Sequence, residues 1–572
     1  MSNKSQKSLS VLYDVLRTLL SYGITVYIFL LIVVLPLYFE QGYGYIATDK
    51  AYFFCKVGIN MGKVLLPVLI VYAITAIAVN HAKMRCFLKK KDLKVVAKQL
   101  ICKISALDFF VGMYGVAVIL SYLCSDYRED ALWGMPGWYM GFVPQMILVA
   151  GYFLVGKLWQ PNKWMFYLIL PVATVVFVLG YLNRFGYYPI EMEYANYSYI
   201  STIGNINWYC SYVVPVLFAG IGLFLGTTAR SKHSVVLRAI AYACLCMFIF
   251  LGFATLITQG SASGIFALGV TMLVLFCVSV KEEGWLRRFW ITALLLSMAC
   301  VGTMFVRNYF PEAITYSDEW MDFLSTGWLP ILMTLVSFIG LACSFLLFKN
   351  HKVQGVKVWH TIAILCVTLV SCVLVVYIVL LTVNTINPGA LGKFSENPVF
   401  VFSDKWGSNR GATWKIGVLC FGEQDFLHKL VGVGPDAMWS YIDTDCSDVL
   451  AELMQKNFGT SQRLTNAHNE WLTILVNYGI FGLVSFVGII ASAIWLFLGR
   501  VIGKCQSCNP VKSGRKKNDA ETLQVIVACG LGILAHTINN IFSFQQVVNV
   551  TLLFLLLGIG RAFLRASEGP NA

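Results

Sequence analysis

The chain has 572 residues, of which 58% are hydrophobic and only 13% are charged. This composition excludes a soluble globular protein and an intrinsically disordered one, and it indicates an integral membrane protein. The net charge of +14 would also fit a nucleic-acid-binding protein, but the positions of the cations give another explanation, described below.

Apolar runs long enough to cross a bilayer recur along the whole chain. A helix needs about 20 residues to cross a hydrocarbon core of about 30 Å. On this measure the sequence predicts an all-α polytopic membrane protein with about 14 spans. The predicted spans lie near 18–38, 57–80, 106–124, 139–157, 164–183, 206–227, 239–258, 264–281, 289–306, 327–348, 359–383, 470–498, 522–542 and 547–564.

Lysine and arginine are concentrated on alternate loops. The richest segments are 83–103, 229–238 and 499–519, and roughly 30 of the 43 cations fall on one side of the predicted membrane. The positive-inside rule makes that side cytoplasmic, so both termini are predicted to be cytoplasmic. Segment 83–103 is also compatible with an interfacial helix on anionic membrane lipids, and no nucleic-acid partner is needed to explain the charge.

Cysteine is abundant, with 17 residues, but most of them fall inside predicted spans, where Cys acts as a small apolar residue. The close pair Cys505 and Cys508 has no second pair and no His nearby. Because a zinc site needs four ligands, no metal site and no cofactor are predicted.

One long gap in the hydropathy divides the chain into three predicted parts. Residues 1–383 form an N-terminal transmembrane bundle of about 11 helices, and residues 468–572 form the C-terminal transmembrane helices. Residues 384–467 form an extracytoplasmic loop that we expect to cover an active site. Within it, 410–422 and 447–459 are predicted to be short amphipathic helices.

Polar and reactive side chains gather where this loop meets the next span. Such groups are costly beside a bilayer, so they are functional candidates. His468 can accept a proton at neutral pH, and Arg410 can hold phosphate oxygens with a planar, permanently charged group. The structural alternatives are that His468 only supports a helix start and that Arg410 is an ordinary interfacial cation.

Several segments resemble the O-antigen ligase and polymerase family in pattern and order. They are SNRGATWK (408–415), the Gly-rich VGVGPDA (431–437) and NAHNEWLTILVNYGIFGL (466–483), with weaker matches at STIGNINWYCSYVVPVL (201–217) and ALWGMPGWYMGF (131–142). This family consists of polytopic glycosyltransferases of the GT-C kind. The resemblance implies an enzyme of the bacterial inner membrane that transfers or polymerises glycans from undecaprenyl diphosphate on the extracytoplasmic face.

The same resemblance implies roles for individual residues. His468 would be the general base, and Arg410 would bind the donor diphosphate, without a metal. The acceptor would be a glycan, a glycolipid or a cell-wall polymer. Candidate substrate-binding residues are Asn469, Glu470, Trp414, Lys415, Arg463, Arg307, Asn205, Asn207, Gly432 and Gly434.

Plainer roles exist for several of these candidates. Asn469, Glu470, Asn205 and Asn207 could simply cap helix starts, and Gly432 and Gly434 could permit a tight turn. The family also has a Ser–Arg pair at a mid-chain span, where this chain reads TQGSASGIFALG (258–269) without Arg. A second diphosphate-binding cation would then come from a different place, with Arg307, Lys415 and Arg463 as candidates.

The sequence leaves two alternatives open. A polytopic protein of this kind could instead be a transporter or flippase of lipid-linked glycans, although no internal repeat is evident. Within the enzyme class, ligase and polymerase cannot be separated, because they share this layout and differ in the acceptor.

Overall fold

The computed structural model describes residues 3–90, 104–226, 235–314, 316–350, 352–459, 462–499 and 518–568. The basic segments 91–103, 229–234 and 500–517 lie outside these ranges. Most of the predicted interfacial helix therefore lies outside the described residues, as does the pair Cys505 and Cys508.

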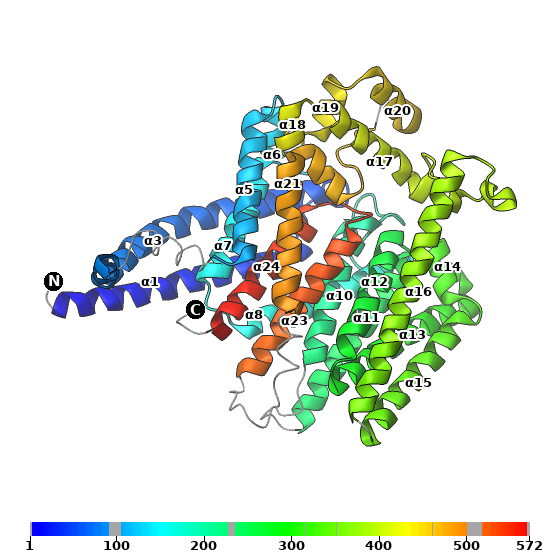
Figure 1. Ribbon diagram of the computed structural model, residues 1–572, viewed down its shortest axis with the longest axis horizontal. Helices are drawn as coiled ribbons and strands as arrows, with labels where there is room; N and C mark the ends of the chain where they lie inside the picture. Colours follow the sequence, from blue (N-terminus) through cyan, green and yellow to red (C-terminus); the bar gives the residue numbers. More distant parts are fainter. Residues whose placement is uncertain are drawn as a thin grey trace.

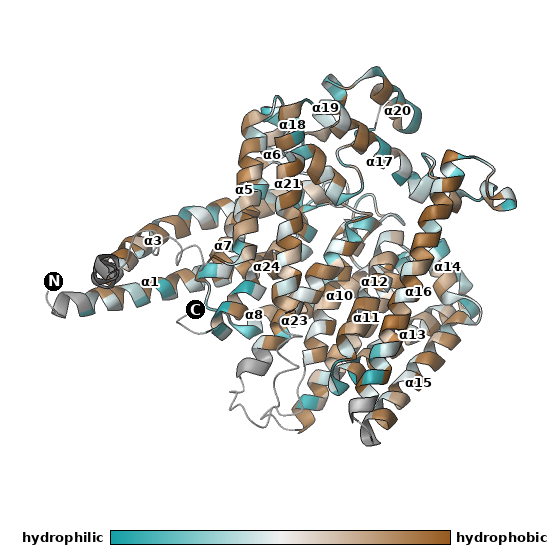
Figure 2. Ribbon diagram, viewed as in Figure 1, coloured by the Kyte–Doolittle hydropathy of each residue, from teal (hydrophilic) through white to brown (hydrophobic). Residues whose placement is uncertain are grey.

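The fold is all-α, as predicted, apart from one short strand pair. Thirteen described helices are long and apolar enough to cross a membrane. The remaining predicted span, 139–157, corresponds to a shorter apolar helix, Phe142–Leu158. The chain is therefore a polytopic membrane protein, and Figure 2 shows apolar residues dominating the long helices.

The elements follow one another along the chain as drawn in Figure 1. The first half contains α1 (Asn3–Phe29), the π-helix η1 (Leu30–Val34), α2 (Leu35–Leu37), α3 (Ile46–Lys90), α5 (Ala106–Cys124), α6 (Arg128–Trp133), α7 (Phe142–Phe153), the π-helix η2 (Leu154–Leu158), α8 (Lys163–Tyr167), α9 (Ile169–Arg184), β1 (Tyr199–Ile200), β2 (Gly204–Asn205), α10 (Ile206–Gly226), α11 (Val235–Gln259) and α12 (Ala262–Ser279). The two strands are antiparallel, with Tyr199 opposite Asn205.

The second half contains α13 (Glu283–Tyr309), η3 (Pro311–Ala313), α14 (Glu319–Ser325), α15 (Leu329–Asn350), α16 (Lys352–Ile386), η4 (Gly392–Glu396), η5 (Pro398–Phe400), α17 (Trp406–Glu423), α18 (Phe426–Val431), α19 (Met438–Thr444), α20 (Asp448–Phe458), α21 (Glu470–Ile494), the π-helix η6 (Trp495–Gly499), α23 (Asn518–Asn539) and α24 (Val547–Glu568). Helices α17 and α20 lie where the two short amphipathic helices were predicted.

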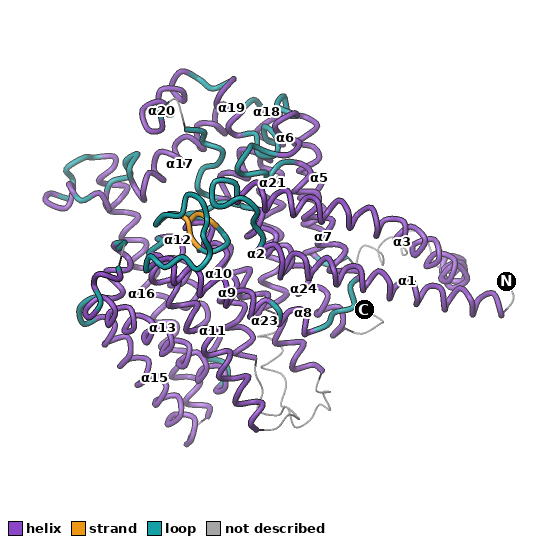
Figure 3. The backbone as a smooth tube through the Cα atoms, turned by 180° about the vertical axis from the view of Figure 1, so that it is seen from behind, coloured by secondary structure: helices purple, strands orange, loops and turns teal. Residues whose placement is uncertain are grey.

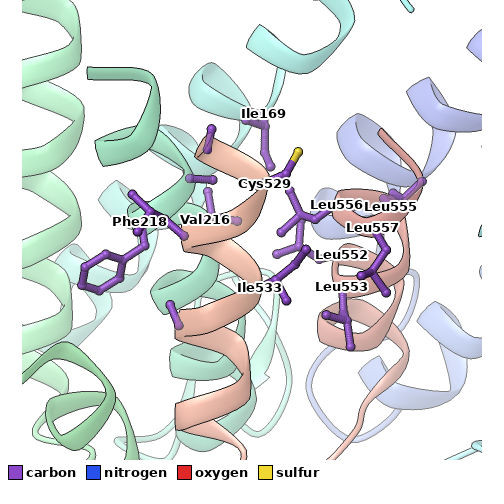
Figure 4. Packing of buried hydrophobic residues seen from close by; sticks show 14 of the residues in the cluster. Ile169, Val216, Phe218, Cys529, Ile533, Leu552, Leu553, Leu555, Leu556 and Leu557 are labelled. Carbon is purple, nitrogen blue, oxygen red and sulfur yellow. The ribbon is translucent and has the colours of Figure 1, made fainter. Parts of the chain in front are cut away.

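The core is formed by α10, α23 and α24. Figure 4 shows Val216 and Phe218 of α10 near Cys529 and Ile533 of α23, with the leucines of α24 on the other side. Every residue from Val547 to Leu564 of α24 is buried. By contrast, no residue in the most apolar window of α16 is buried, so this helix presents its apolar surface to the bilayer.

Helices α17 to α20 cover one end of the bundle (Figure 1). Loops gather at the same end, including the loop with the strand pair, as Figure 3 shows from behind. We call this region the loop-rich end. The segment between α23 and α24, residues 540–546, also lies there: α23 ends at Asn539, earlier than the predicted span boundary at residue 542.

Candidate functional site

Arg410 is buried near the start of α17, with only 7% of its surface exposed. The residues before it, Gly407, Ser408 and Asn409, adopt left-handed backbone angles that turn the chain sharply into the helix. The Arg410 Nε donates to the Phe542 carbonyl oxygen at 3.0 Å, and one terminal nitrogen, Nη1, donates to that of Gly407 at 2.8 Å. Burial lowers the pKa of Arg410 to about 10, so the group stays cationic at neutral pH.

His468 lies in the turn that precedes α21. Its backbone has φ of +49°, which is unusual for a residue with a Cβ. The Asn466 side chain supports this turn by accepting the His468 backbone N–H at 3.0 Å. The imidazole ring packs edge-to-face on Phe544, with ring centroids 4.8 Å apart.

Arg410 and His468 contact the same short segment of chain, the 540–546 connection, at Phe542 and Phe544 respectively. Burial, and to a smaller extent the charge of Arg410, lower the pKa of His468 to about 4. The structure thus brings together two residues that are 58 positions apart, as their numbers in the sequence show. His468 is a neutral base at neutral pH.

Aromatic rings line one side of this arrangement. Trp414 stacks on Phe542 with centroids 5.6 Å apart, and Trp406 contacts both rings. The indole Nε1 of Trp414 is buried and has no hydrogen-bond partner among the residues described. An unused N–H donor therefore lies beside the Arg410 region.

Asn469 and Glu470 are both engaged at the start of α21. Asn469 is the N-cap, and its side chain accepts the Leu472 N–H at 3.0 Å. Glu470 is buried, and its carboxylate accepts the Gln545 N–H at 2.6 Å. Asn469 therefore has the capping role that was its plainer alternative. Glu470 holds the 540–546 connection through the backbone of Gln545.

Gly432 and Gly434 lie against the backbone of α21 where that helix kinks. Gly479 has φ of +64° inside α21, and the loop packs into the kink: Val433 and Gly434 donate N–H groups to the carbonyls of Val476 and Asn477, both at 3.2 Å. A Cβ on Gly432 would lie 2.2 Å from the Asn477 backbone. The glycines thus allow close backbone approach.

Asn205 and Asn207 lie at the entrance to α10, in the same loop-rich end. The Asn205 side chain accepts the Asn207 N–H at 2.9 Å, and the Asn207 amide oxygen accepts the Ser261 hydroxyl at 3.3 Å. Ser261 belongs to the segment that lacks the expected Arg.

Arg184 from α9 reaches this same segment, and no sequence motif indicated this contact. It donates to the carbonyls of Thr258 and Gln259 at 2.8 and 3.0 Å and to the Tyr197 carbonyl at 2.9 Å. Because all three of its nitrogens serve backbone carbonyls, Arg184 supports the segment structurally.

The three candidate second cations occupy different surroundings. Arg307 pairs with Asp322, between α13 and α14. Lys415 pairs with Asp404 at 2.8 Å and follows Trp414 directly. Arg463 is exposed in the turn before α21. Of these, Lys415 lies on the same helix as Arg410.

A large apolar groove runs between α17 and α21. Its volume is about 670 Å³. The apolar lining includes Phe402, Val418, Leu419, Leu453, Trp471, Leu472, Leu475 and Leu483, and the polar lining residues are Lys415 and Asn469, with Trp414 beside them. Along the part of the chain that the structure describes, no three His, Cys, Asp or Glu side chains gather as a metal site would require.

Comparison with known protein families gives a match in the second half of the chain. A family model described as O-antigen ligase matches residues 323–487. The matched segment contains Arg410, the Gly-rich loop and His468, and it ends before the 540–546 connection. A search of curated proteins finds no match.

Proposed function

We propose that this protein transfers or polymerises glycans from undecaprenyl diphosphate, because a family model described as O-antigen ligase matches its residues 323–487. At the coarser level it is a membrane enzyme of glycan transfer. We place the reaction on the extracytoplasmic face of the bacterial inner membrane, under the cover formed by residues 384–467.

The observation that carries this proposal is the shared contact of Arg410 and His468 with the 540–546 connection. A buried cation and a neutral base contact Phe542 and Phe544, two residues apart in one short segment. Glycosyl transfer from a diphosphate needs these two groups: positive charge for the departing diphosphate and an acceptor for the proton of the attacking hydroxyl.

Arg410 is suited to the diphosphate because part of its guanidinium remains available. Nε and Nη1 each hold a carbonyl, whereas Nη2 makes no hydrogen bond to any described residue. In the proposed step, the acceptor oxygen forms a bond to the anomeric carbon. The bond from that carbon to the diphosphate oxygen breaks, and the guanidinium of Arg410 stabilises the negative charge of the departing diphosphate.

His468 takes the proton of the acceptor hydroxyl in that step. Its lowered pKa keeps it unprotonated before the substrates bind. When the anionic diphosphate arrives beside Arg410, it offsets the positive charge that depresses the His468 pKa. The base therefore becomes stronger in the complex in which it is needed.

The apolar groove supports a lipid-linked donor. Its volume of about 670 Å³ and its apolar walls suit part of a prenyl chain. One of its polar lining residues, Lys415, lies on α17 with Arg410. We propose Lys415 as the second cation for the diphosphate, in exchange for part of its contact with Asp404. The unused Trp414 N–H is a further donor at this end.

The test is a transfer assay with purified protein in nanodiscs. The donor is a short oligosaccharide on undecaprenyl diphosphate, supplied with a mixture of acceptors and followed by mass spectrometry in the presence of EDTA. Release of undecaprenyl diphosphate with a lengthened glycan identifies a polymerase, and a sugar adduct on another acceptor identifies a ligase. A folded, donor-binding protein that releases nothing refutes transfer, and movement of donor across proteoliposomes then identifies a transporter.

A further inference from the structure

We propose that Asp436 and Trp138 are positioning residues for His468: Asp436 fixes the loop 134–141, and this loop holds Trp138 against Phe544, the ring on which His468 packs. The inference rests on the proposed function, in which His468 is the base. It assigns a role to a carboxylate and an indole that touch no reacting atom.

Asp436 closes the loop 134–141 from both sides of Trp138. One of its carboxylate oxygens accepts the backbone N–H of Met135 at 2.9 Å and that of Met140 at 3.1 Å. The residue is 5% exposed, and among the residues described no Lys, Arg or His forms a salt bridge with it. A buried carboxylate without a cation is costly, so these two N–H groups are its main compensation.

The position of Asp436 is itself fixed by the Gly-rich loop. Its backbone has φ of +59°, and two residues earlier the Gly434 N–H is bonded to α21. The Ser125 hydroxyl also donates to the Val433 carbonyl at 2.7 Å. Gly134 faces the carboxylate so closely that a Cβ there would lie 2.5 Å from Asp436 Oδ2.

Trp138 transmits this fixed position through a series of ring contacts. It packs edge-to-face on Phe544 with centroids 4.9 Å apart, and on Trp208 at 5.8 Å. Phe544 in turn meets the His468 ring at 4.8 Å and an angle of 89°. Edge-to-face pairs have a preferred geometry, so a shift of Trp138 changes where Phe544 and the imidazole rest.

A small cavity lies between Asp436 and Trp138 on one side and the residues that contact His468 on the other. It has a volume of about 20 Å³, enough for roughly one water, and its walls include Trp138, Asp436, Asn466, Glu470 and Phe544. Asn466 is the residue that supports the His468 backbone. Truncation of Asp436 or Trp138 therefore enlarges a space that borders both supports of the strained His468 turn.

The test compares truncating and conservative variants in the nanodisc transfer assay. Asp436→Ala and Trp138→Ala are each expected to lower kcat by about tenfold to a hundredfold, with donor KM changed less, since the base is displaced while the donor cation is intact. Asp436→Asn keeps an acceptor oxygen and Trp138→Phe keeps a ring, so each should recover most of the loss. The double variant Asp436→Ala with Trp138→Ala should lose no more than either single one.

Matched controls are Asp443→Asn, an exposed acid within α19, and Trp133→Phe, an exposed ring next to the same loop. Both should leave kcat unchanged. A second measurement is the acid limb of kcat/KM, which should move upward in pH in the two Ala variants, because looser packing lets water reach His468 and relieves the desolvation of its charged form.

Wild-type kcat in both Ala variants would overturn the inference. So would fully additive losses, or losses explained by a smaller folded fraction with an unmoved acid limb. If instead the wild-type protein itself transfers no glycan, the proposed function fails, and the two failures are thereby distinguishable.

Discussion

The pKa of His468 connects its surroundings with a measurable pH dependence. Burial and the Arg410 charge lower this pKa to about 4, from an ordinary value near 6.5. We predict that the acid limb of kcat/KM, which reports the free enzyme, lies near pH 4. The acid limb of kcat should lie at higher pH, because the bound diphosphate opposes the effect of Arg410.

The same shift affects stability, and its sign is fixed. A folded pKa below the unfolded one means that the unfolded chain binds the proton first. The free energy of unfolding should therefore fall as pH drops from about 6.5 to about 4, and His468→Gln should flatten that part of the profile. The control for this stability profile is His428→Gln, elsewhere in the loop-rich end. For the rate profiles of the preceding prediction, coincident acid limbs for kcat and kcat/KM would contradict the proposed effect of the bound diphosphate on the His468 pKa.

The variant Arg410→Lys tests the proposed role of the buried Arg410 guanidinium. We predict a loss of about 10² in transfer rate, because an ammonium cannot hold two carbonyls and a diphosphate in one plane. Arg128→Lys is matched, since Arg128 also donates to backbone carbonyls, those of Ser125 and Leu123. Wild-type turnover in Arg410→Lys would move the diphosphate site to another part of the protein.

At the scale of elements, the fit of the Gly-rich loop into the kink of α21 supports the whole loop-rich end. In Gly432→Ala, an added Cβ would collide with the Asn477 backbone at a φ of +82°. We predict that this variant unfolds at lower temperature and loses transfer activity. Gly459→Ala shares the left-handed angle but meets nothing within 4 Å, so it should show only the conformational cost of about 1–3 kcal/mol. Equal thermal shifts in the two variants would argue against a tight fit.

Three further elements are joined by Asp108 of α5. It accepts a hydrogen bond from Tyr152 at 2.8 Å, pairs with Lys157 of η2 and lies 3.5 Å from Arg561 of α24. We predict that Asp108→Ala lowers the stability by about 3–5 kcal/mol, measured as detergent-resistant folded yield, because Lys157 loses its ion-pair partner and Arg561 keeps only Glu568. Asp14→Ala, at an exposed site on α1, should have no effect. Equal yields would show that water replaces the carboxylate.

At the scale of the whole molecule, the proposed orientation can be measured. Position 449 of α20 is 63% exposed at the loop-rich end, whereas Lys281 is exposed between α12 and α13, on the side predicted to be cytoplasmic. In intact cells, an impermeant maleimide should label Val449→Cys above the parental background and should label Lys281→Cys only after permeabilisation. The opposite pattern would place the reaction in the cytoplasm.

The sequence predicted the spans well because crossing a bilayer requires long apolar runs, a local property of the chain. It also pointed to Arg410 and His468, through short polar motifs at a loop–helix junction. It placed Phe542 at the end of the span 522–542 and Phe544 in the short loop that follows, but it could not predict that either residue would contact Arg410 or His468. Nor could it find Arg184 beside Thr258, or Asp436 beside Met135, because these contacts join residues far apart in the chain.

The position of the 540–546 connection limits how this protein can be divided. The matched family segment ends at residue 487, yet the ring beneath the imidazole and the carbonyl that holds Arg410 come from a hairpin that follows it. A chimera that grafts only residues 323–487 onto a related bundle would place His468 and Arg410 against a hairpin from another protein. A graft that also carries α23, the hairpin and α24 would keep the contacts of Arg410 with Phe542 and of His468 with Phe544. The exchangeable unit is therefore defined by these three-dimensional contacts and extends beyond the matched segment.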